Sequence, residues 1–389
     1  QIPSPGSQNK KDEVPPQVEI FAKPALLTNQ TAAAFSFSAN KKEVSFQCQI
    51  DEQGWEDCFS SLVYNNLIDG KHIFQVKAKD IFGNIGEPTL YFWEIDTTIE
   101  SPSLRFVDSN NSPILYTNVQ RVKIEIFNEK EASGWFISEN SFPPALDSPD
   151  WLFTEPVDFL LSTGEGVKTV YIWTRDAAEN ISKLGNSASI TLDTLTPELS
   201  INDKPALLTN QTSAAFSFSA SEDCTFEYKI DDDVWQQDYN TERSLGIVIF
   251  NDLSEGQHIF QVKAIDQAGN PILESLTYSW LIDITPPSSR VDTLATSSAL
   301  SYCALQWSGA DELSGVINYS IKYKDNLDGD LQELFQSTTT LLAEFKGEDG
   351  HTYYFRSQTL DAAENEEDWP EEPDSFCKIE IPKEEIKDE

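Results

Sequence analysis

Histidine, the side chain that most often moves protons in catalysis, occurs only three times in this 389-residue sequence. His72 and His258 occupy the same position in two copies of HIFQVKA, and His351 stands alone. The alternation of that segment predicts that His72 and His258 point inward and hydrogen-bond a backbone corner; metal ligation or general-base chemistry is the alternative. No nucleophile elbow, zinc-binding helix or phosphate loop accompanies them. The sequence therefore predicts a protein that is not an enzyme.

Carboxylates are abundant, with 65 Asp and Glu against 27 Lys and Arg, and the formal charge is −38. This charge disfavours nucleic acid and anionic membranes, which bind through clustered basic residues. No apolar run reaches the roughly 18 residues of a membrane helix. We therefore expect no nucleic-acid partner and no membrane insertion. Cations are natural counterions of such a surface, although solubility alone also explains it.

Aspartates recur at two places in a repeated pattern. One ends an alternating strand and is followed by Asn four positions later; the other closes a repeat in IDTT, LDTLTP or IDITPP. Calcium prefers several carboxylate oxygens, so the sequence predicts possible calcium at the joints between repeats and no obligatory cofactor. The alternative is that each Asp only caps its own turn. The candidate ligands are Asp80, Asp96, Asp176, Asp193, Asp266 and Asp283.

The five cysteines form two candidate pairs with one left over. Cys48 and Cys58 flank the turn DEQG and could face each other across a hairpin. Cys303 and Cys377 lie near opposite ends of the fourth repeat and could join an early strand to the last one. Cys224 has no partner in its repeat, and we expect a buried, small apolar side chain there.

Paired aromatic side chains suggest a further site. If Val170 and Ile172 point inward on their strand, Tyr171 and Trp173 point outward together. Exposed aromatic pairs can stack on sugar rings, which makes this strand a candidate glycan site. The alternative is that the two rings lie along a neighbouring strand or a domain joint.

The elements that carry these residues are short alternating strands. His72, Phe74 and Val76 share one face of HIFQVKA, and AAFSFSA and VSFQCQI alternate in the same way. Turn sequences such as DEQG, IDG and FGN separate the runs, and no segment keeps a helical period. Strands at this spacing predict an all-β chain built of sandwiches.

Internal repetition sets the domain organisation. KPALLTNQT occurs at 23–31 and again at 204–212, and AAFSFSA and HIFQVKA recur in the same order. We expect duplicated sandwiches in a tandem, rod-like array with two more divergent repeats. The predicted segments are an N-terminal tail at 1–16, domains at 17–97, 98–195, 196–285 and 286–383, and an acidic C-terminal tail at 384–389.

These motifs resemble known modules. Repeats one and three resemble bacterial immunoglobulin-like repeats of secreted, multi-domain surface proteins, and repeat two resembles a related immunoglobulin-like repeat. Repeat four resembles a fibronectin type III-like module. The motifs are FQCQID (46–51), WEDC (55–58), LIDGKHIFQVKAKDIFGN (67–84) and YFWEIDTT (91–98) in repeat one, GEGVKTVYIWTRDAAENIS (164–182) in repeat two, and LQWSGADELSGVINYSIKY (305–323) and GHTYYFRSQTLDAAENEEDWP (350–370) in repeat four.

The resemblance implies four immunoglobulin-like β-sandwiches, the last of them fibronectin type III-like, and a Cys48–Cys58 disulfide, which belongs to an oxidising compartment. Two features depart from the pattern. Repeat three has Tyr228 and Asp238 in place of those cysteines. Glu179 and Glu364 replace the turn glycines Gly83 and Gly269, so we expect the two Glu turns to differ or to be strained.

The functional expectation is a non-catalytic, extracellular structural or adhesive array that serves as a spacer or interaction stalk of a surface protein. The sequence lacks Met and starts at Gln1, as expected of a processed or excised chain. Two alternatives stay open: a self-assembling subunit of a filament or surface layer, and an accessory module that binds a glycan or a protein. The expected partners are neighbouring repeats, copies of the chain, or such a ligand.

Overall fold

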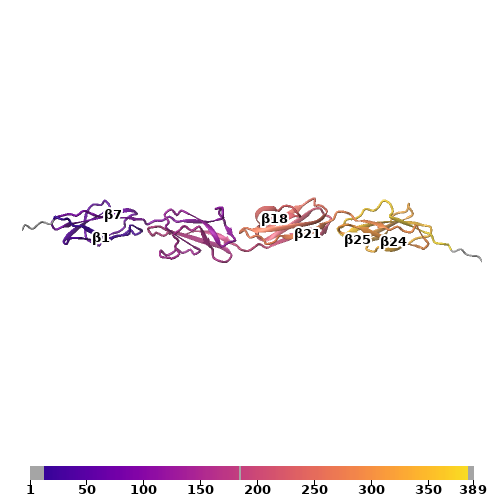
Figure 1. The fold of residues 1–389 in the computed structure, drawn as a ribbon. Coiled ribbons are helices and arrows are strands. Elements are labelled where there is room, and N and C mark those ends of the chain that lie inside the picture. The colour runs from indigo at the N-terminus through magenta and orange to yellow at the C-terminus, as the bar shows by residue number, and fades with distance from the viewer. Residues whose placement is uncertain (1–12, 184, 384–389) are drawn as a thin grey trace, which may run out of the picture. The chain divides into compact units, whose positions relative to one another are not determined.

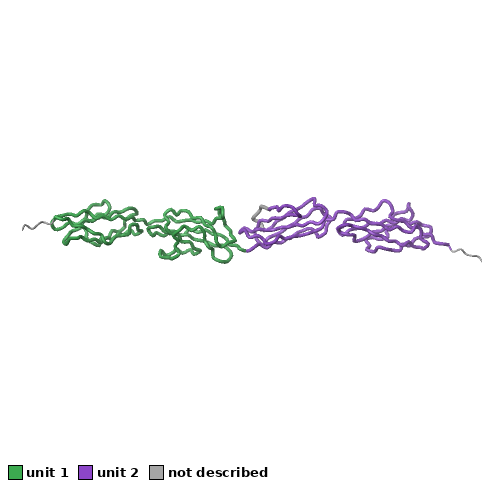
Figure 2. The backbone as a smooth tube through the Cα atoms, viewed as in Figure 1, with its two compact units in different colours: residues 1–194 green, residues 195–389 purple. Residues whose placement is uncertain are grey.

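The computed structural model describes residues 13–183 and 185–383, and every regular element in these ranges is a β-strand. The predicted C-terminal tail at 384–389 and most of the N-terminal tail lie outside the described residues. The chain divides into two compact units, residues 1–194 and 195–389 (Figure 2). Each unit holds two sandwiches with separate cores, numbered 1 to 4 along the chain (Figure 1).

Sandwich 1 pairs a three-stranded sheet with a five-stranded one. The first contains β1 (Val18–Ala22), β3 (Ala33–Ala39) and β6 (Leu62–Tyr64). The second has the order β2 (Leu27–Thr28), β8 (Thr89–Ile95), β7 (Gly70–Asp80), β4 (Val44–Ile50) and β5 (Glu56–Cys58). Alternation places Phe35 and Phe74 between the sheets, where their rings stack with centroids 4.0 Å apart. The apolar face predicted for HIFQVKA is the core face.

Sandwich 2 completes unit 1. One sheet contains β9 (Ser103–Val107), β11 (Arg121–Phe127) and β13 (Asp158–Leu160). The other contains β10 (Tyr116–Thr117), β15 (Asn186–Leu192), β14 (Gly166–Arg175) and β12 (Gly134–Ser138). Val170 and Ile172 are core residues as expected, but Trp173 is only 1% exposed. A Cβ on Gly185 would lie 2.6 Å from its ring, because the chain after β14 covers the indole. The expected exposed Tyr171–Trp173 pair is therefore wrong.

Sandwich 3 opens unit 2 with a single continuous sheet. Its strands are β16 (Leu199–Asp203), β17 (Leu208–Thr209), β18 (Ala214–Ile230), β19 (Gln236–Phe250), β20 (Gly256–Asp266) and β21 (Leu276–Ile282). The long β18 spans the stretch that β3 and β4 cover in sandwich 1, and β19 pairs with it near both ends. The duplicate sequences therefore differ mainly at this lateral hairpin.

Sandwich 4 again has two sheets. One contains β22 (Ser288–Val291), β24 (Tyr302–Ala310) and β27 (Leu342–Lys346). The other contains β23 (Ser297–Ser298), β29 (Ser375–Ile379), β28 (Thr352–Asp361), β25 (Val316–Asp325) and β26 (Gln332–Thr338). Trp307 and Phe355 are buried between the sheets.

All four sandwiches split their first strand. In sandwich 1 the first part, β1, pairs antiparallel with β3, and the second part, β2, crosses over to pair parallel with β8. The pairs β9/β10, β16/β17 and β22/β23 repeat this arrangement. The chain is thus an all-β tandem array of immunoglobulin-like sandwiches.

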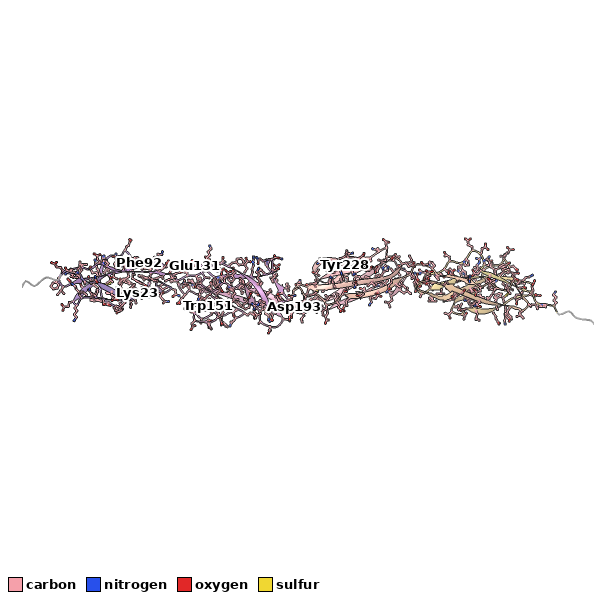
Figure 3. The ribbon with its side chains drawn as sticks, in the orientation of Figure 1. Lys23, Phe92, Glu131, Trp151, Asp193 and Tyr228 are labelled. Atoms are coloured by element: carbon pink, nitrogen blue, oxygen red, sulfur yellow. A yellow bond between two sulfur atoms is a disulfide. The ribbon has the colours of Figure 1, made fainter. Side chains whose placement is uncertain are left out.

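The repeated nonapeptide KPALLTNQT begins between the two parts of this split strand and holds it against the neighbouring sheet. Lys23, labelled in Figure 3, lies 4.6 Å above the ring of Tyr91. The Tyr91 hydroxyl donates a 2.6 Å hydrogen bond to the carbonyl of Pro24. Sandwich 3 repeats both contacts through Lys204, Pro205 and Tyr278. The repeated nonapeptide therefore has the same structural role in both sandwiches, which is to hold the first strand in place.

Candidate functional site

The two repeated histidines are corner residues of their own sandwiches. His72 is buried; its Nε2 lies 2.8 Å from the Ile68 carbonyl and its Nδ1 lies 3.0 Å from Asp51. Burial lowers the pKa of His72, but the hydrogen bonds to Ile68 and Asp51 outweigh it and hold the pKa above its usual value. His258 makes the same two contacts, with the Ser254 carbonyl and Asp231. With both ring nitrogens engaged, neither histidine is presented to a substrate.

Sandwich 4 uses a tyrosine at the same place. The Tyr353 hydroxyl accepts a 3.0 Å hydrogen bond from the backbone N–H of Glu348. His351, two residues earlier, lies 2.9 Å from both carboxylate oxygens of Asp325. That hydrogen bond raises the pKa of His351. All three histidines therefore pair with carboxylates inside single sandwiches.

A capped Asp…Asn turn follows the long penultimate strand in all four sandwiches. In sandwich 1 Asp80 accepts the backbone N–H of Asn84 at 2.9 Å and its side-chain amide at 3.0 Å. The same pair of bonds joins Asp176 to Asn180, Asp266 to Asn270 and Asp361 to Asn365. Turn capping, the alternative expected from sequence, is thus present at every turn. It leaves lone pairs on each carboxylate for a further partner.

The turn asparagines also hold neighbouring sandwiches together within each unit. The Asn180 amide donates a 2.8 Å hydrogen bond to the carbonyl of Asp96, the residue that closes sandwich 1. In unit 2 the Asn365 amide donates a 2.7 Å bond to the carbonyl of Asp283, which closes sandwich 3. One side chain therefore caps a turn and grips the preceding sandwich.

A second repeated contact fixes the chain as it leaves each sandwich. An acidic side chain just before a glycine accepts hydrogen bonds from a residue two or three positions after the end of the last strand. Glu255 accepts both the backbone N–H and the hydroxyl of Thr285 at 2.9 Å. These bonds lower the pKa of Glu255. The corresponding pairs are Asp69 with Thr97, Glu165 with Thr194 and Asp349 with Ile381.

Three carboxylates converge at the joint inside unit 2. Oxygens of Asp283, Asp311 and Asp361 all lie within 4.8 Å of one another. Asp283 and Asp361 are fully buried, and Asp311 is partly buried. Asp283 accepts the backbone N–H of Ser314 at 3.0 Å, so the loop after β24 is tied to the end of sandwich 3. An adjoining cavity of about 300 Å³ is lined by Glu255 and Glu312 as well as by Asp283 and Asp311.

This carboxylate group fits a hard cation. Among the described residues, no Lys, Arg or His forms an ion pair with Asp283, Asp311 or Asp361. Buried carboxylates this close repel one another unless a proton or a cation intervenes. Oxygen-rich groups of this kind are the ligands that calcium prefers, and backbone carbonyls or water complete its shell. The joint in unit 2 is therefore the candidate metal centre.

The other expected ligands have different surroundings. Asp80 lies 3.1 Å from the ammonium of Lys41, so a side chain of sandwich 1 itself balances the charge of this carboxylate. Burial opposes ionisation of Asp80, but hydrogen bonds from Asn84, Lys41 and Phe82 lower its pKa to about 2. Asp96 caps Thr98, and Asp176 caps Asn180. Asp193 and Asp266 belong to different units, and Asp266 caps Asn270.

Two members of the carboxylate group, Asp311 and Asp361, were missing from the ligands expected from sequence. Asp361 begins the fourth copy of the Asp…Asn pattern, in the register of Asp80, Asp176 and Asp266, but it was not counted among the ligands. Asp311 lies in the loop DELSG, whose counterpart in repeat two, KEASG (130–134), has Lys130 at its position. Only the fold brings it to the joint.

The structure contains both candidate disulfides. Cys48 and Cys58 join β4 to the edge strand β5, with Cα atoms 5.8 Å apart. Cys303 and Cys377 join β24 to β29 across the two sheets, with Cα atoms 6.4 Å apart. Cys224 is a buried free thiol whose pKa is raised to about 12 by burial and by nearby carboxylates. Tyr228, labelled in Figure 3, takes the place of Cys48 in sandwich 3.

The glutamates in the Asp…Asn turns adopt the conformation of the glycines they replace. Gly83 and Gly269 have φ of 88° and 93°, and Glu179 and Glu364 both have φ of 69°. A side chain in this left-handed region costs roughly 1–2 kcal/mol. All four turns therefore share one backbone conformation, and it is strained at Glu179 in sandwich 2 and at Glu364 in sandwich 4.

Comparison with known proteins gives likeness of fold only. No protein-family model and no curated protein matches the sequence. A crystal structure of a tetra-tandem repeat in the extending region of a large adhesion protein aligns over 90% of this chain and 96% of that one, with 15% identity and a TM-score of 0.34. Fibronectin(III)-like modules of Clostridium thermocellum CbhA align over 49% of this chain and 98% of theirs, with 11% identity and a TM-score of 0.27.

The described part of the chain contains no helix long and apolar enough to cross a bilayer.

Proposed function

We propose that this chain is a non-catalytic, extracellular array whose sandwiches act as an extended spacer or interaction stalk of a surface protein. The observation that carries the proposal is the asparagine bond from the turns of sandwiches 2 and 4 to the preceding sandwich, made by Asn180 in unit 1 and Asn365 in unit 2. Bonds that fix adjacent sandwiches end to end are expected of a spacer, because a spacer must keep the groups at its two ends apart. The two disulfides fit an oxidising compartment.

Small-angle scattering tests the spacer role. Four sandwiches in tandem, with a strand rise of about 3.3 Å per residue, predict a maximum dimension on the order of 120–160 Å. Replacing both joint asparagines in N180A/N365A should broaden the distance distribution while each sandwich stays folded. N110A/N202A, which changes two exposed asparagines away from these two bonds, is the control. A compact particle, or a profile unchanged by N180A/N365A, argues against a spacer stiffened at these joints.

We further propose that the joint in unit 2 binds one calcium ion through Asp283, Asp311 and Asp361. The support is the buried, uncompensated charge of this group. Isothermal titration with calcium should give one site per chain. D311N should weaken it about tenfold or more, because one of three carboxylates is lost. D328N, an equal charge change in the exposed β25–β26 loop, should leave binding intact. If D311N binds calcium as tightly as the unaltered chain in this titration, the assignment is contradicted.

A further inference from the structure

The lateral side of sandwich 1 contains a cavity of about 410 Å³ between its two sheets. It lies where β5 ends the five-stranded sheet and β6 ends the three-stranded sheet. Only residues 59–61 connect the two strands, so both outer strand edges face this opening. The volume lies within the roughly 300–1,000 Å³ of pockets that hold ligands.

The floor of this lateral cavity is apolar. The Cys48–Cys58 disulfide and Ile50 contribute from the five-stranded sheet, and Leu62 and Tyr64 contribute from β6. Leu62 and Tyr64 pack against the core, so the cavity continues the interior of the sandwich to its side. A single aliphatic or aromatic side chain from outside would extend the core there.

The rim of the lateral cavity is acidic and carries one exposed ring. Glu56 and Asp57 lie on the edge strand β5, and among the described residues neither forms an ion pair. Asp57 accepts a 3.2 Å hydrogen bond from the side-chain amide of Gln47. Phe59 stands at the opening with 86% of its surface exposed. The rim thus combines uncompensated negative charge with exposed apolar surface.

The duplicate sandwich 3 differs at these same positions. Pairing with Tyr228 and Glu227 places Gln236 and Gln237 where sandwich 1 has Glu56 and Asp57. The strand β19 runs without interruption from Gln236 to Phe250, and six more residues lie between Asp238 and Val248 than between their counterparts Cys58 and Leu62. At the positions of Glu56 and Asp57, sandwich 3 therefore has two uncharged residues.

We propose that this lateral cavity is a binding site for an extended polypeptide segment in which Lys or Arg alternates with apolar residues. Free strand edges offer backbone N–H and C=O groups that a peptide strand satisfies by joining the sheet. Because successive residues of β5 point to opposite faces, side chains on one face of the bound strand would enter the apolar floor, with Glu56 at its margin, and basic side chains on the other face would meet Asp57, which shares the outer face with Gln47. A glycan is less well matched, because the nearby ring of Trp55 is covered by the Lys77 ammonium, 3.9 Å from its centroid.

This inference concerns sandwich 1 alone, so its failure would leave the spacer role untouched. The test is selection of random short peptides, displayed on phage, against the immobilised full chain. The enriched peptides should alternate basic and apolar residues. A synthetic peptide of the enriched sequence, followed by fluorescence anisotropy, should bind E56Q/D57Q about tenfold more weakly than the unaltered chain, the sum expected for two rim ion pairs.

The double variant copies the residues that sandwich 3 already carries, so it is expected to fold. E19Q/E94Q is the matched control, since these exposed glutamates lie on β1 and β8, away from β5 and β6 in the strand order. Bound peptide should slow hydrogen exchange in residues 56–64. The inference is overturned if no peptide is enriched, if the enriched peptides lack basic residues, if E56Q/D57Q binds as well as E19Q/E94Q, or if the protection falls elsewhere.

Discussion

In unit 1 the turn of sandwich 2 holds the end of sandwich 1 through Asn180, and in unit 2 the turn of sandwich 4 holds the end of sandwich 3 through Asn365. The surroundings of the two bonds differ. A cavity of about 50 Å³ beside the joint in unit 1 is lined by Lys130 as well as by three glutamates. The cavity of about 300 Å³ in unit 2 is lined by four acidic residues and by no basic one.

The acidic loop residue also has a different role in the two joints. In unit 1, Glu129 accepts a hydrogen bond from the indole of Trp135, and burial raises its pKa. In unit 2, Asp311 accepts backbone N–H groups and adds its charge to Asp283 and Asp361. The joint in unit 1 thus includes one basic residue among its glutamates, whereas the joint in unit 2 gathers carboxylates that call for a cation.

Removing the disulfides should give the largest contrast between the units. The Cys303–Cys377 bond closes 74 residues and the Cys48–Cys58 bond closes 10. In the chain-entropy account these are worth about 4 and about 3 kcal/mol. C303S/C377S should therefore destabilise sandwich 4 more than C48S/C58S destabilises sandwich 1, as measured by urea unfolding. Equal losses would show that strain or residual structure outweighs loop length.

Replacing the joint asparagines should have the next largest effect. N365A and N180A each remove two hydrogen bonds from buried or partly buried acceptors, which costs about 2 kcal/mol. N365A should cost more, because it removes an amide donor from Asp361 while Asp283 and Asp311 still repel it. Thermal unfolding of the two variants measures the difference. A larger loss for N180A would show that the charges in unit 2 are already neutralised by protons.

The strained glutamates predict a smaller gain. E364G and E179G should each stabilise their sandwich by about 1 kcal/mol, since glycine adopts φ of 69° without a Cβ clash but loses more backbone entropy on folding. E364A and E179A, which keep the Cβ, are the controls and should give no gain. If alanine stabilises as much as glycine, side-chain charge and not backbone strain is responsible.

The smallest effect should appear in acid. The pKa of Asp80 is lowered to about 2, so its stabilising contribution is present above the ordinary Asp range and is lost as the pH falls through about 2. K41Q removes one donor and should raise the Asp80 pKa, so that the loss begins at higher pH. Carboxyl-detected NMR titration measures this directly. An Asp80 pKa unchanged in K41Q would mean that the turn alone sets it.

Much of the fold could be predicted from the sequence, because alternation and duplicated segments report directly on strands and repeats. His72, Phe74 and Val76 face the core as their period requires. Trp173 lies on the predicted face beside Tyr171, but it is covered and packs against Phe136 of the neighbouring strand β12, because period 2 does not show what covers the outer side of a sheet. The boundaries of the compact units also depend on contacts that no local pattern contains.

The candidate site was only partly predictable. Asp283 was found because it ends a repeated strand, and Asp361 shares a register that the first three repeats display. Asp311 was missed because the corresponding β11–β12 loop of sandwich 2 has Lys130 at that position, so no repeated acidic pattern marks it. Asp311 approaches Asp283 only because of how the two sandwiches of unit 2 contact each other. Contacts between distant loops produce no periodic pattern in a sequence.

Hydrogen exchange of the full chain, with calcium and with a chelator, tests most directly whether the joint in unit 2 differs from that in unit 1 by holding a cation. Calcium at a hundred times its dissociation constant should stabilise the bound joint by about 2.7 kcal/mol. The account predicts slower exchange with calcium in residues 311–315 and 361–365, no change in 128–134 and 176–180, and loss of the effect in D311N. Equal protection of both joints, or none at 311–315 and 361–365, would contradict it.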